Sequence, residues 1–321
     1  MNSRFAGCLV GLACGDALGG PAEEIPGHPG KVVKPVTEMI GGGNFGLLFG
    51  QITDDTEMAL CLVRSLIEKQ GFDPADVAHK FKEWFFDSPI GAGGTVRTAM
   101  ERLRDGHSWE EAGNSELGLK SLGNGSVMRC APIAMFDCYC PEALTKHTHE
   151  QGIITHPRLE CAQAAYFINK IISYLLKATE PSKEELTRAM SSGTLTIHGP
   201  RAAIVYALQY VGVETQEKYK DIAKREQINP SGTVHNTVIA SVNCLLTTYT
   251  FEDAIVKAVN LGGDADTIAA ITGAMAGAWY GIEAIPERWS SKLVDRHGKP
   301  VLEELMTSSE ALYQLALKQK S

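Results

Sequence analysis

Two stripes of small residues constrain the fold of this chain more than any other feature. Small residues recur at every fourth position near the N-terminus and again near position 270, at Gly7, Gly11, Gly15 and at Ala269, Gly273, Gly277. Glycine costs roughly 1 kcal/mol against alanine inside a helix, so a repeated glycine needs a structural reason. Close approach of two helix backbones is such a reason. We therefore predict two tightly packed central helices, which bring the loop from Asp16 to Glu24 near the turn from Gly262 to Thr267.

The rest of the chain also follows the helical period. Apolar residues from Met58 to Ile67 repeat at helix spacing, this stretch stops at Gly71, and Asp73-Pro74 opens another helical stretch that ends at Phe86. Further helical patterns cover residues 96–103, 159–176, 202–211, 234–248, 251–259 and 301–317. Convincing strand patterns are absent, so helix on helix is the layer architecture that the sequence supports. The predicted fold class is all-α.

The chain shows no internal boundary. No repeat, composition shift or Pro/Ser-rich linker divides its 321 residues. The polar segment 215–232 is expected to be a surface excursion. We predict a single domain over residues 1–321.

Composition limits the classes of partner. A net charge of -8 argues against a protein that coats nucleic acid or an anionic membrane. It leaves a phosphate-bearing ligand open, because local amides and cations can offset a global charge. The eight cysteines include no CxxC pair, which favours reduced thiols in a cytoplasmic protein. The apolar run from Phe5 to Cys14 contains glycines and lacks a typical cleavage site, so we expect a core helix there rather than a signal peptide or membrane anchor.

Three polar segments can carry chemistry. The first is Thr53-Asp54-Asp55-Thr56, at the start of a predicted helix. Thr and Asp are common helix caps, and for this segment alone capping is the simpler interpretation. Two carboxylates beside a hydroxyl are also a hard-oxygen ligand set for Mg²⁺ or Mn²⁺.

The second segment opens the helix that carries the later small-residue stripe. It reads Gly262-Gly263-Asp264-Ala265-Asp266-Thr267 and offers a second oxygen-rich set, again with capping as the alternative. Four carboxylates that converge in one cleft repel one another unless protons or cations neutralise them. Two divalent ions are the simplest neutralisation.

The third segment is a glycine-rich turn. It reads Gly123-Asn124-Gly125-Ser126-Val127-Met128-Arg129 and would expose backbone amides at a helix start, which is a common phosphate cradle. An ordinary turn explains the same pattern. His156, in Thr155-His156-Pro157, is compatible with a structural role or with ligand contact.

These segments occur in an order that resembles one family. With Gly15-Asp16-Ala17-Leu18-Gly19 near the N-terminus, the series is similar to that of the ADP-ribosylglycohydrolases, from about Phe5 to Trp289. The resemblance implies a compact orthogonal helical bundle with a central pair of Mg²⁺ or Mn²⁺ ions. The segment His235-Asn236-Thr237 departs from the family pattern, because many bacterial members have Asp before this Thr. The departure concerns one wall of the implied substrate site.

The resemblance also assigns roles to individual residues. It implies that Thr53, Asp54 and Asp55 bind one ion, that Asp266 bridges, and that Asp264 and Thr267 bind the other. Glu23, or the adjacent Glu24, matches an acidic residue that gates the metal site. The substrate-binding residues implied are Gly123, Asn124, Gly125, Ser126, Met128 and His156. Asp87 follows Trp84 in a region where arginine-specific and serine-specific members diverge, and it could face a guanidinium leaving group.

The expected reaction is metal-dependent hydrolysis of the N- or O-glycosidic bond between ADP-ribose and an acceptor, which is a protein side chain or a small molecule. A cation-bound water would be the nucleophile, with Asp55 or Glu23 as base. Two alternatives remain at this point: another two-metal phosphohydrolase that acts on a nucleotide, and a non-catalytic member that binds ADP-ribose or serves a structural role. The expected partner is ADP-ribose or an ADP-ribosylated substrate, and the expected state is a monomer or weak homo-oligomer.

Overall fold

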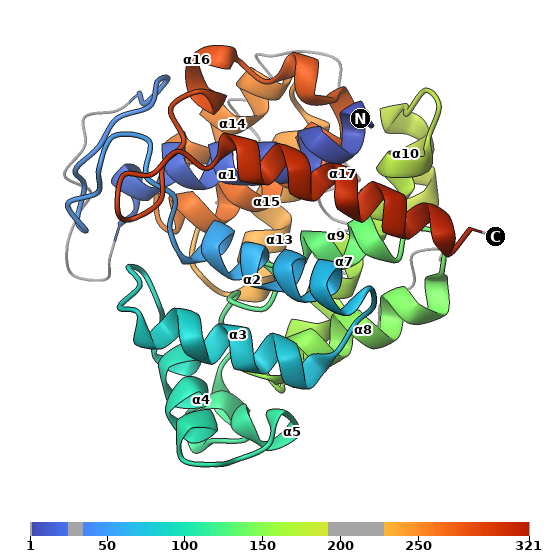
Figure 1. The fold of residues 1–321 in the computed structure, drawn as a ribbon. Helices are drawn as coiled ribbons and strands as arrows, with labels where there is room; N and C mark the ends of the chain where they lie inside the picture. Colours follow the sequence, from blue (N-terminus) through green and yellow to red (C-terminus); the bar gives the residue numbers. More distant parts are fainter. Residues whose placement is uncertain (1, 25–34, 192–227, 321) are drawn as a thin grey trace.

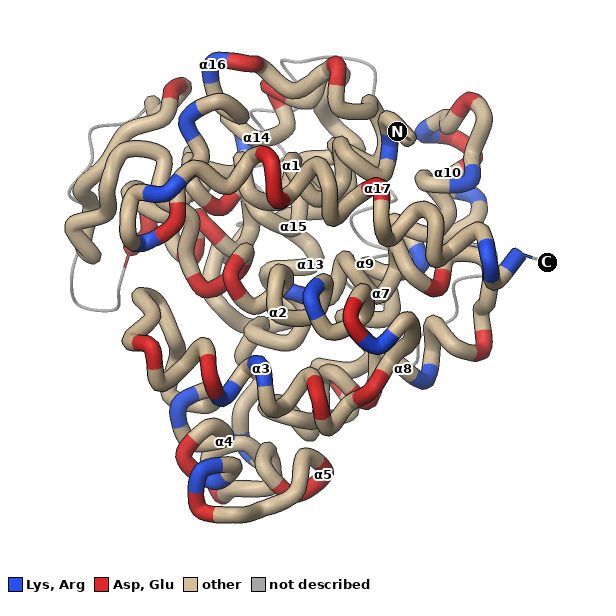
Figure 2. Tube along the Cα trace, viewed as in Figure 1, with Lys and Arg blue, Asp and Glu red and all other residues tan. Residues whose placement is uncertain are grey.

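The computed structural model describes residues 2–24, 35–191 and 228–320, and these residues fold into helices joined by loops (Figure 1). Within the described ranges no strand forms, and backbone pairing outside the helices consists of isolated bridges such as Gly123 with Thr233. The predicted all-α class is confirmed. Lysine and arginine are interspersed with acidic residues along the described helices (Figure 2).

The helices have the following bounds in chain order: α1 (Ser3–Gly19), η1 (Gly20–Ala22), α2 (Asp54–Lys69), α3 (Pro74–Phe86), α4 (Gly94–Arg104), α5 (Trp109–Ala112), α6 (Glu116–Lys120), α7 (Ala131–Phe136), α8 (Pro141–Ile153), α9 (Leu159–Lys177), α10 (Lys183–Ser191), α13 (Val234–Leu246), α14 (Phe251–Asn260), α15 (Ala265–Tyr280), η2 (Ile282–Ala284), α16 (Glu287–Ser290) and α17 (Leu302–Lys318).

Most predicted helices agree with these bounds, and the differences lie at their ends. Asp73 caps α3 as its sequence suggests, because its side chain accepts from the amides of Ala75 and Asp76. Gln70, rather than Gly71, takes the left-handed conformation that ends α2, with a φ of 53°. The pattern over residues 202–211 lies outside the described residues.

Helices α1 and α15 form the centre of the molecule and run antiparallel at very short distance (Figure 1). A Cβ on Gly11 would lie 2.3 Å from the carbonyl oxygen of Gly273, and a Cβ on Gly277 would lie 1.8 Å from that of Gly7. No side chain fits in these places, so the two stripes are required for the contact. The prediction of two tightly packed central helices is confirmed.

The register of this contact places the candidate functional segments side by side. Gly15 faces Ala269, and one turn later Gly19 faces Ala265 and Asp266. The C-terminal end of α1 therefore meets the N-terminal end of α15. The stripes fix which loops meet as well as how closely the helices pack.

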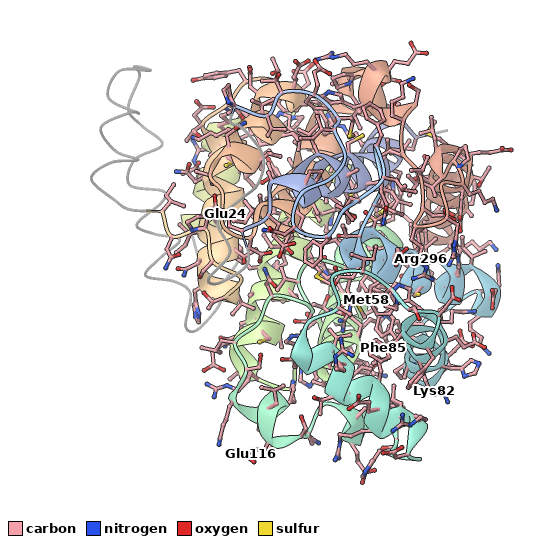
Figure 3. The ribbon with its side chains drawn as sticks, turned by 90° about the vertical axis from the view of Figure 1, so that its left-hand side faces the viewer. Glu24, Met58, Lys82, Phe85, Glu116 and Arg296 are labelled. Atoms are coloured by element: carbon pink, nitrogen blue, oxygen red, sulfur yellow. The ribbon has the colours of Figure 1, made fainter. Side chains whose placement is uncertain are left out.

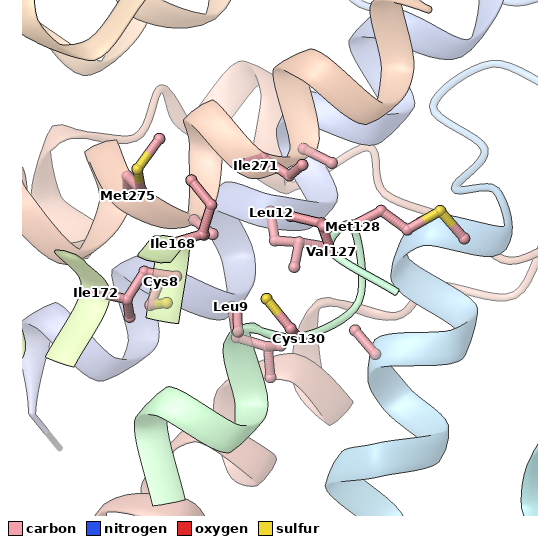
Figure 4. Close-up of a cluster of buried hydrophobic side chains, with 14 of the residues drawn as sticks. Cys8, Leu9, Leu12, Val127, Met128, Cys130, Ile168, Ile172, Ile271 and Met275 are labelled. Carbon is pink, nitrogen blue, oxygen red and sulfur yellow. The ribbon is translucent and has the colours of Figure 1, made fainter. Parts of the chain in front are cut away.

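Helix α1 is also apolar along its whole length. The segment Ser3–Ala22 is long and apolar enough to cross a membrane by length and composition, and in this structure the most apolar window of this segment is fully buried inside the protein. Its side chains Leu9 and Leu12 belong to the main cluster of buried hydrophobic residues, with Val127 and Cys130 beside them (Figure 4). The expected core helix is therefore present, and it also anchors the turn that contains Val127.

The α1–α15 contact makes Gly273→Ala a strongly destabilising substitution. Alanine is the better helix former by roughly 1 kcal/mol, but its Cβ would lie 2.0 Å from the carbonyl oxygen of Gly11. Overpacking of this kind typically costs 1–3 kcal/mol, and here rigid backbone must move, so we expect a loss of about 3 kcal/mol. Gly71→Ala is the matched control, because its nearest neighbour would be at 3.8 Å. Urea denaturation that gives equal stabilities for the two variants contradicts the contact.

Candidate active site

A cavity of about 870 Å³ opens where the ends of α1, α2 and α15 meet. Most of the residues that the sequence singled out line it. The lining residues are Glu23, Glu24, Asp54, Asp55, Gly91, Gly93, Thr95, Val96, Gly123, Asn124, Gly125, Met128, His156, Asn229, Pro230, Ser231, Gly232, Gly263, Asp264, Asp266 and Thr267.

The structure argues against capping as the role of the two acidic segments. Thr53 is the residue before α2, and its side chain makes no capping hydrogen bond. Asp264 holds the same position before α15, and its side chain does not cap either. Asp54, Asp55 and Asp266 follow in the first turns and line the cavity. Asp54 and Asp55 are therefore available to a ligand, whereas Thr53 does not line the cavity and one oxygen of Asp266 accepts the Thr267 amide at 2.8 Å.

Asp16 is a site residue that the sequence reasoning left without a role. It is fully buried at the end of α1, and its carboxylate accepts hydrogen bonds from the amides of Thr53 and Thr56, at 3.0 and 3.1 Å. The Thr53 hydroxyl donates to the same carboxylate at 2.7 Å. Asp16 therefore fixes the start of α2 against α1. The available sequence signal was its position directly after the glycine stripe.

The cavity carboxylates raise one another's pKa. Burial is the main cause of the raised pKa of Asp54, Asp55 and Asp266, and repulsion from neighbouring carboxylates adds to it. The same two causes raise the pKa of Glu23 to about 7. Such a cluster is costly in its charged form until protons or cations neutralise it.

The donor set fits divalent cations. Ligand oxygens of Glu23, Asp264 and Asp266 lie within 4.8 Å of one another. Asp55 has one buried oxygen with no hydrogen-bond partner among the described residues, and a buried polar atom of this kind calls for a ligand. Thr267 donates to the other Asp55 oxygen at 3.5 Å, which connects the two acidic segments. Of the two candidates for the gating carboxylate, Glu23 belongs to this cluster, whereas Glu24 is exposed at the rim.

A pH-dependent stability follows from Glu23. Its pKa is about 7 in the folded protein against an ordinary value of 4.5, so the folded metal-free protein retains a proton over this interval that the unfolded chain has lost. This contribution to the free energy of unfolding falls as pH rises from about 4.5 to 7. The neutral His156 acts in the opposite direction, so the useful quantity is the Tm difference between wild type and Glu23→Gln.

We expect metal-free wild type to lose Tm relative to Glu23→Gln as pH rises through this interval. Saturating Mg²⁺ should remove that loss, because a bound cation stabilises the folded state. The measurement is thermal unfolding of chelator-treated protein at a series of pH values. A Tm difference that does not change with pH, or changes in the opposite direction, contradicts the burial of Glu23 among carboxylates.

The glycine-rich turn differs in part from the prediction. It does not begin a helix, because α7 starts only at Ala131. The amides of Val127 and Met128 donate to the Asn124 carbonyl, whereas the amides of Gly125 and Ser126 have no protein acceptor among the described residues. Two amides are thus free to bind an anion. Ser126 is fully buried, and it is not among the residues that line the cavity.

Asn124 lines the cavity as expected, and its side chain has protein partners there. Its side-chain amide donates to Asp264 and, at 2.9 Å, to the Thr237 hydroxyl. It therefore also orients a candidate metal ligand. Thr237 accepts this bond, and the neighbouring Asn236 donates to Ser231 at 2.8 Å. The His235-Asn236-Thr237 segment thus supports the cavity wall.

His156 lies directly beneath the glycine-rich turn. A Cβ on Gly125 would be 2.7 Å from the His156 ring, so glycine is needed for the turn to cross it. The ring nitrogen Nδ1 pairs with the Thr155 hydroxyl at 2.8 Å. Burial, with Arg129 nearby, lowers the pKa of His156 to about 3, so the imidazole is neutral. A neutral ring offers one nitrogen to a ligand hydroxyl.

Arg129 holds the turn and the histidine together, a role that the sequence did not reveal. It is fully buried and donates to the Gly125 carbonyl and to the Thr155 hydroxyl, both at 2.9 Å. Its guanidinium lies over the Phe81 ring at 4.6 Å, and Gln151 accepts further bonds. The Arg129 guanidinium therefore fixes both the glycine-rich turn and the segment that carries His156.

Two further expected features have the following positions. Asp87 does not line the main cavity, and Arg296 pairs with it at 2.7 Å and also with Glu57. Most of the segment 215–232 lies outside the described residues, which begin again at residue 228. Its described part includes Asn229 to Gly232, which line the cavity, and the Pro230 carbonyl accepts from the Asp264 amide at 2.8 Å. This contact helps to position Asp264.

Comparisons with known proteins identify the family of the chain. A family model described as ADP-ribosylglycohydrolase matches residues 1–321. An ADP-ribosylarginine hydrolase of Serratia proteamaculans is 33% identical over 98% of this chain and 80% of its own length. An ADP-ribosyl-[dinitrogen reductase] glycohydrolase of Rhodospirillum rubrum is 31% identical over 91% of both chains. A solved structure titled ADP-ribosylglycohydrolase-related protein complex superposes with a TM-score of 0.78 and 31% identity over 98% of both chains.

Proposed function

Because the chain belongs to the ADP-ribosylglycohydrolase family, we propose that it hydrolyses the glycosidic bond between ADP-ribose and an arginine side chain of its acceptor. The observation that carries the proposal is the convergence of both acidic segments, the glycine-rich turn and His156 on one cavity. Arginine is chosen because a relative with 33% identity is named for that linkage. The chain is accordingly a hydrolase of glycosyl bonds, and the reaction reverses ADP-ribosylation.

The acidic cavity supports a divalent cation requirement, and we propose two ions, Mg²⁺ or Mn²⁺. Thr53, Asp54 and Asp55 would hold one ion, Asp264 and Thr267 the other, and Asp266 would contact both. Divalent cations, when bound, would polarise water and lower its pKa. The orphaned oxygen of Asp55 and the cluster of Glu23, Asp264 and Asp266 support this assignment.

The chain's own groups bind the substrate and move the proton. The free amides of Gly125 and Ser126 bind the diphosphate, because backbone amides in a glycine turn suit anions. Neutral His156 accepts or donates one hydrogen bond to a ribose hydroxyl, and Met128 packs against the substrate. Glu23 or Asp55 accepts the proton of the attacking water. The surrounding carboxylates stabilise the positive charge that develops at the anomeric carbon.

We propose that the protein acts in the cytoplasm, with its eight cysteines free as in the structure, and as a monomer or weak homo-oligomer. Sedimentation velocity over a range of concentrations tests the oligomeric state, and a tight oligomer at submicromolar concentration contradicts it. Fractionation of cells that express the chain tests the cytoplasmic location.

A panel of substrates tests the proposed reaction. ADP-ribosyl-arginine, a peptide with ADP-ribosyl-serine, and a nucleoside diphosphate are each incubated with the protein and Mg²⁺ or Mn²⁺. We expect free ADP-ribose from the arginine conjugate and none after chelation. Phosphate from the nucleoside diphosphate would instead support a two-metal phosphohydrolase. ADP-ribose binding without turnover of any conjugate would mark a non-catalytic member.

A further inference from the structure

A second cavity lies next to the proposed active site and is not used by it. It has a volume of about 500 Å³ and is lined by Phe45, Phe85, Phe86, Ser88, Pro89, Gly91, Ala92 and Arg97. Phe85 marks its position on the side of the molecule that Figure 3 faces. Its lining combines three aromatic rings and a proline with the polar side chains of Ser88 and Arg97.

The two cavities meet at Gly91, which lines both. Gly91 has a φ of +96°, and a Cβ there would lie 2.3 Å from Oδ1 of Asp54. The second cavity therefore borders the carboxylate end of the main cavity. In the proposed reaction the anomeric carbon lies among the carboxylates, so the second cavity is next to the position of the acceptor.

Two phenylalanines form one wall of the second cavity. Phe86 is 47% exposed, and its ring contacts that of Phe85 edge to face at 5.2 Å. An exposed aromatic ring offers contact area to an apolar side chain of a bound polypeptide.

Arg97 gives this surface a positive charge that favours a negatively charged group on the partner. Its guanidinium lies over the Phe85 ring at 5.6 Å. Among the described residues it has no salt-bridge partner, so its hydrogen-bond donors remain for a ligand. A stacked, unpaired guanidinium suits a carboxylate. A partner that fits both features has an apolar side chain close to an acidic one.

We propose that this second cavity, which we call the acceptor cavity, binds the polypeptide that flanks the ADP-ribosylated side chain. The inference rests on the proposed function and makes it more specific. The preferred acceptor is a protein segment, not a small molecule, with an apolar residue in the acceptor cavity and an acidic residue on Arg97. The acceptor cavity contributes to affinity for the conjugate and not to the chemistry.

The test compares one conjugate with and without flanking polypeptide. Substrates are ADP-ribosyl-arginine and heptapeptides with a central ADP-ribosyl-arginine, in which a Leu-Asp pair or a Ser-Asn pair occupies each flanking position in turn. The variants are Phe86→Ser and Arg97→Glu. Tyr249→Ser, at a residue 80% exposed outside both cavities, and Arg188→Glu on α10 are the matched controls.

We expect wild type to have an approximately tenfold lower KM for at least one Leu-Asp peptide than for its Ser-Asn counterpart. Phe86→Ser and Arg97→Glu should each remove about this factor through KM, which corresponds to roughly 1.4 kcal/mol of lost binding. Hydrolysis of ADP-ribosyl-arginine should stay within about twofold of wild type in every variant, as expected for groups that act only on flanking residues.

Each of the other outcomes contradicts either the acceptor cavity or the proposed function. Equal KM values for the two peptide types, or equal effects of the test and control variants, overturn the acceptor cavity. Equal losses on peptide and on ADP-ribosyl-arginine also overturn it, because they place the defect in the active site. Failure of wild type on ADP-ribosyl-arginine and all peptides overturns the proposed function instead, and the acceptor cavity with it.

Discussion

Asp54→Asn and Asp266→Asn should each lower the hydrolysis of an ADP-ribosyl conjugate by more than about 100-fold. Loss of a residue that only supports a metal ligand typically costs 10–100-fold, so loss of a ligand should cost more. Asparagine retains the shape of aspartate and removes one charge. Both residues are buried in the cavity among other raised-pKa carboxylates, so removing a charge should leave the fold intact or stabilise the metal-free form.

The informative control is Asp73→Asn. Asp73 is a true helix cap, since its side chain accepts two backbone amides at the start of α3, and asparagine caps about as well as aspartate. We expect normal activity and stability for this variant. Steady-state rates with circular dichroism on all three proteins make the comparison. Near-normal rates in the Asp54 and Asp266 variants would show that these residues act as helix caps and not as metal ligands.

The second large effect is expected from Gly125→Val, which should weaken ADP-ribose binding by at least about 100-fold. The new Cβ would lie 2.7 Å from the His156 ring, and the valine methyl groups would cover the amides that bind the diphosphate. Losing two charge-assisted hydrogen bonds at about 1.5–3 kcal/mol each supports this magnitude. Because Gly125 is not among the residues with positive φ, valine does not strain the backbone torsion itself.

Calorimetric titration of ADP-ribose into Mg²⁺-loaded proteins measures this effect. Gly71→Val is the matched control, at a glycine with space around it and outside the cavity. Metal affinity should be unchanged in Gly125→Val, because no candidate metal ligand is altered. If folded Gly125→Val binds ADP-ribose as tightly as wild type, the diphosphate lies elsewhere.

The sequence predicted the parts of this molecule that depend on local pattern. Helical periodicity located the helices, and the small-residue stripes predicted the α1–α15 contact. The glycine register brings the end of α1 to the start of α15, but it does not place α2, which carries Asp55. The start of α2 is held at the end of α1 by Asp16, and the sequence assigned Asp55 and Asp264 to one site only through the family resemblance.

Side-chain partners were less accessible to sequence reasoning. The Asn124 side chain lies in the cavity and donates to Asp264, a contact that the sequence of the turn did not predict. Asp87 pairs with Arg296, which lies 209 positions away. Arg129 looked like an ordinary residue of the turn, and only the fold shows that it is buried among carbonyl acceptors. Such pairings depend on how helices cross, and a single sequence does not determine these contacts.

The binding of two divalent ions in the acidic cavity is tested by the number of ions bound per chain. Chelator-stripped protein is equilibrated with Mn²⁺, separated from free ions and measured by elemental analysis for protein-bound metal. We expect about two Mn²⁺ per chain for wild type and fewer for Asp266→Asn, because Asp266 is assigned to both ions. Wild-type protein that is folded and binds no divalent ion, or that binds only zinc through cysteine, would contradict it.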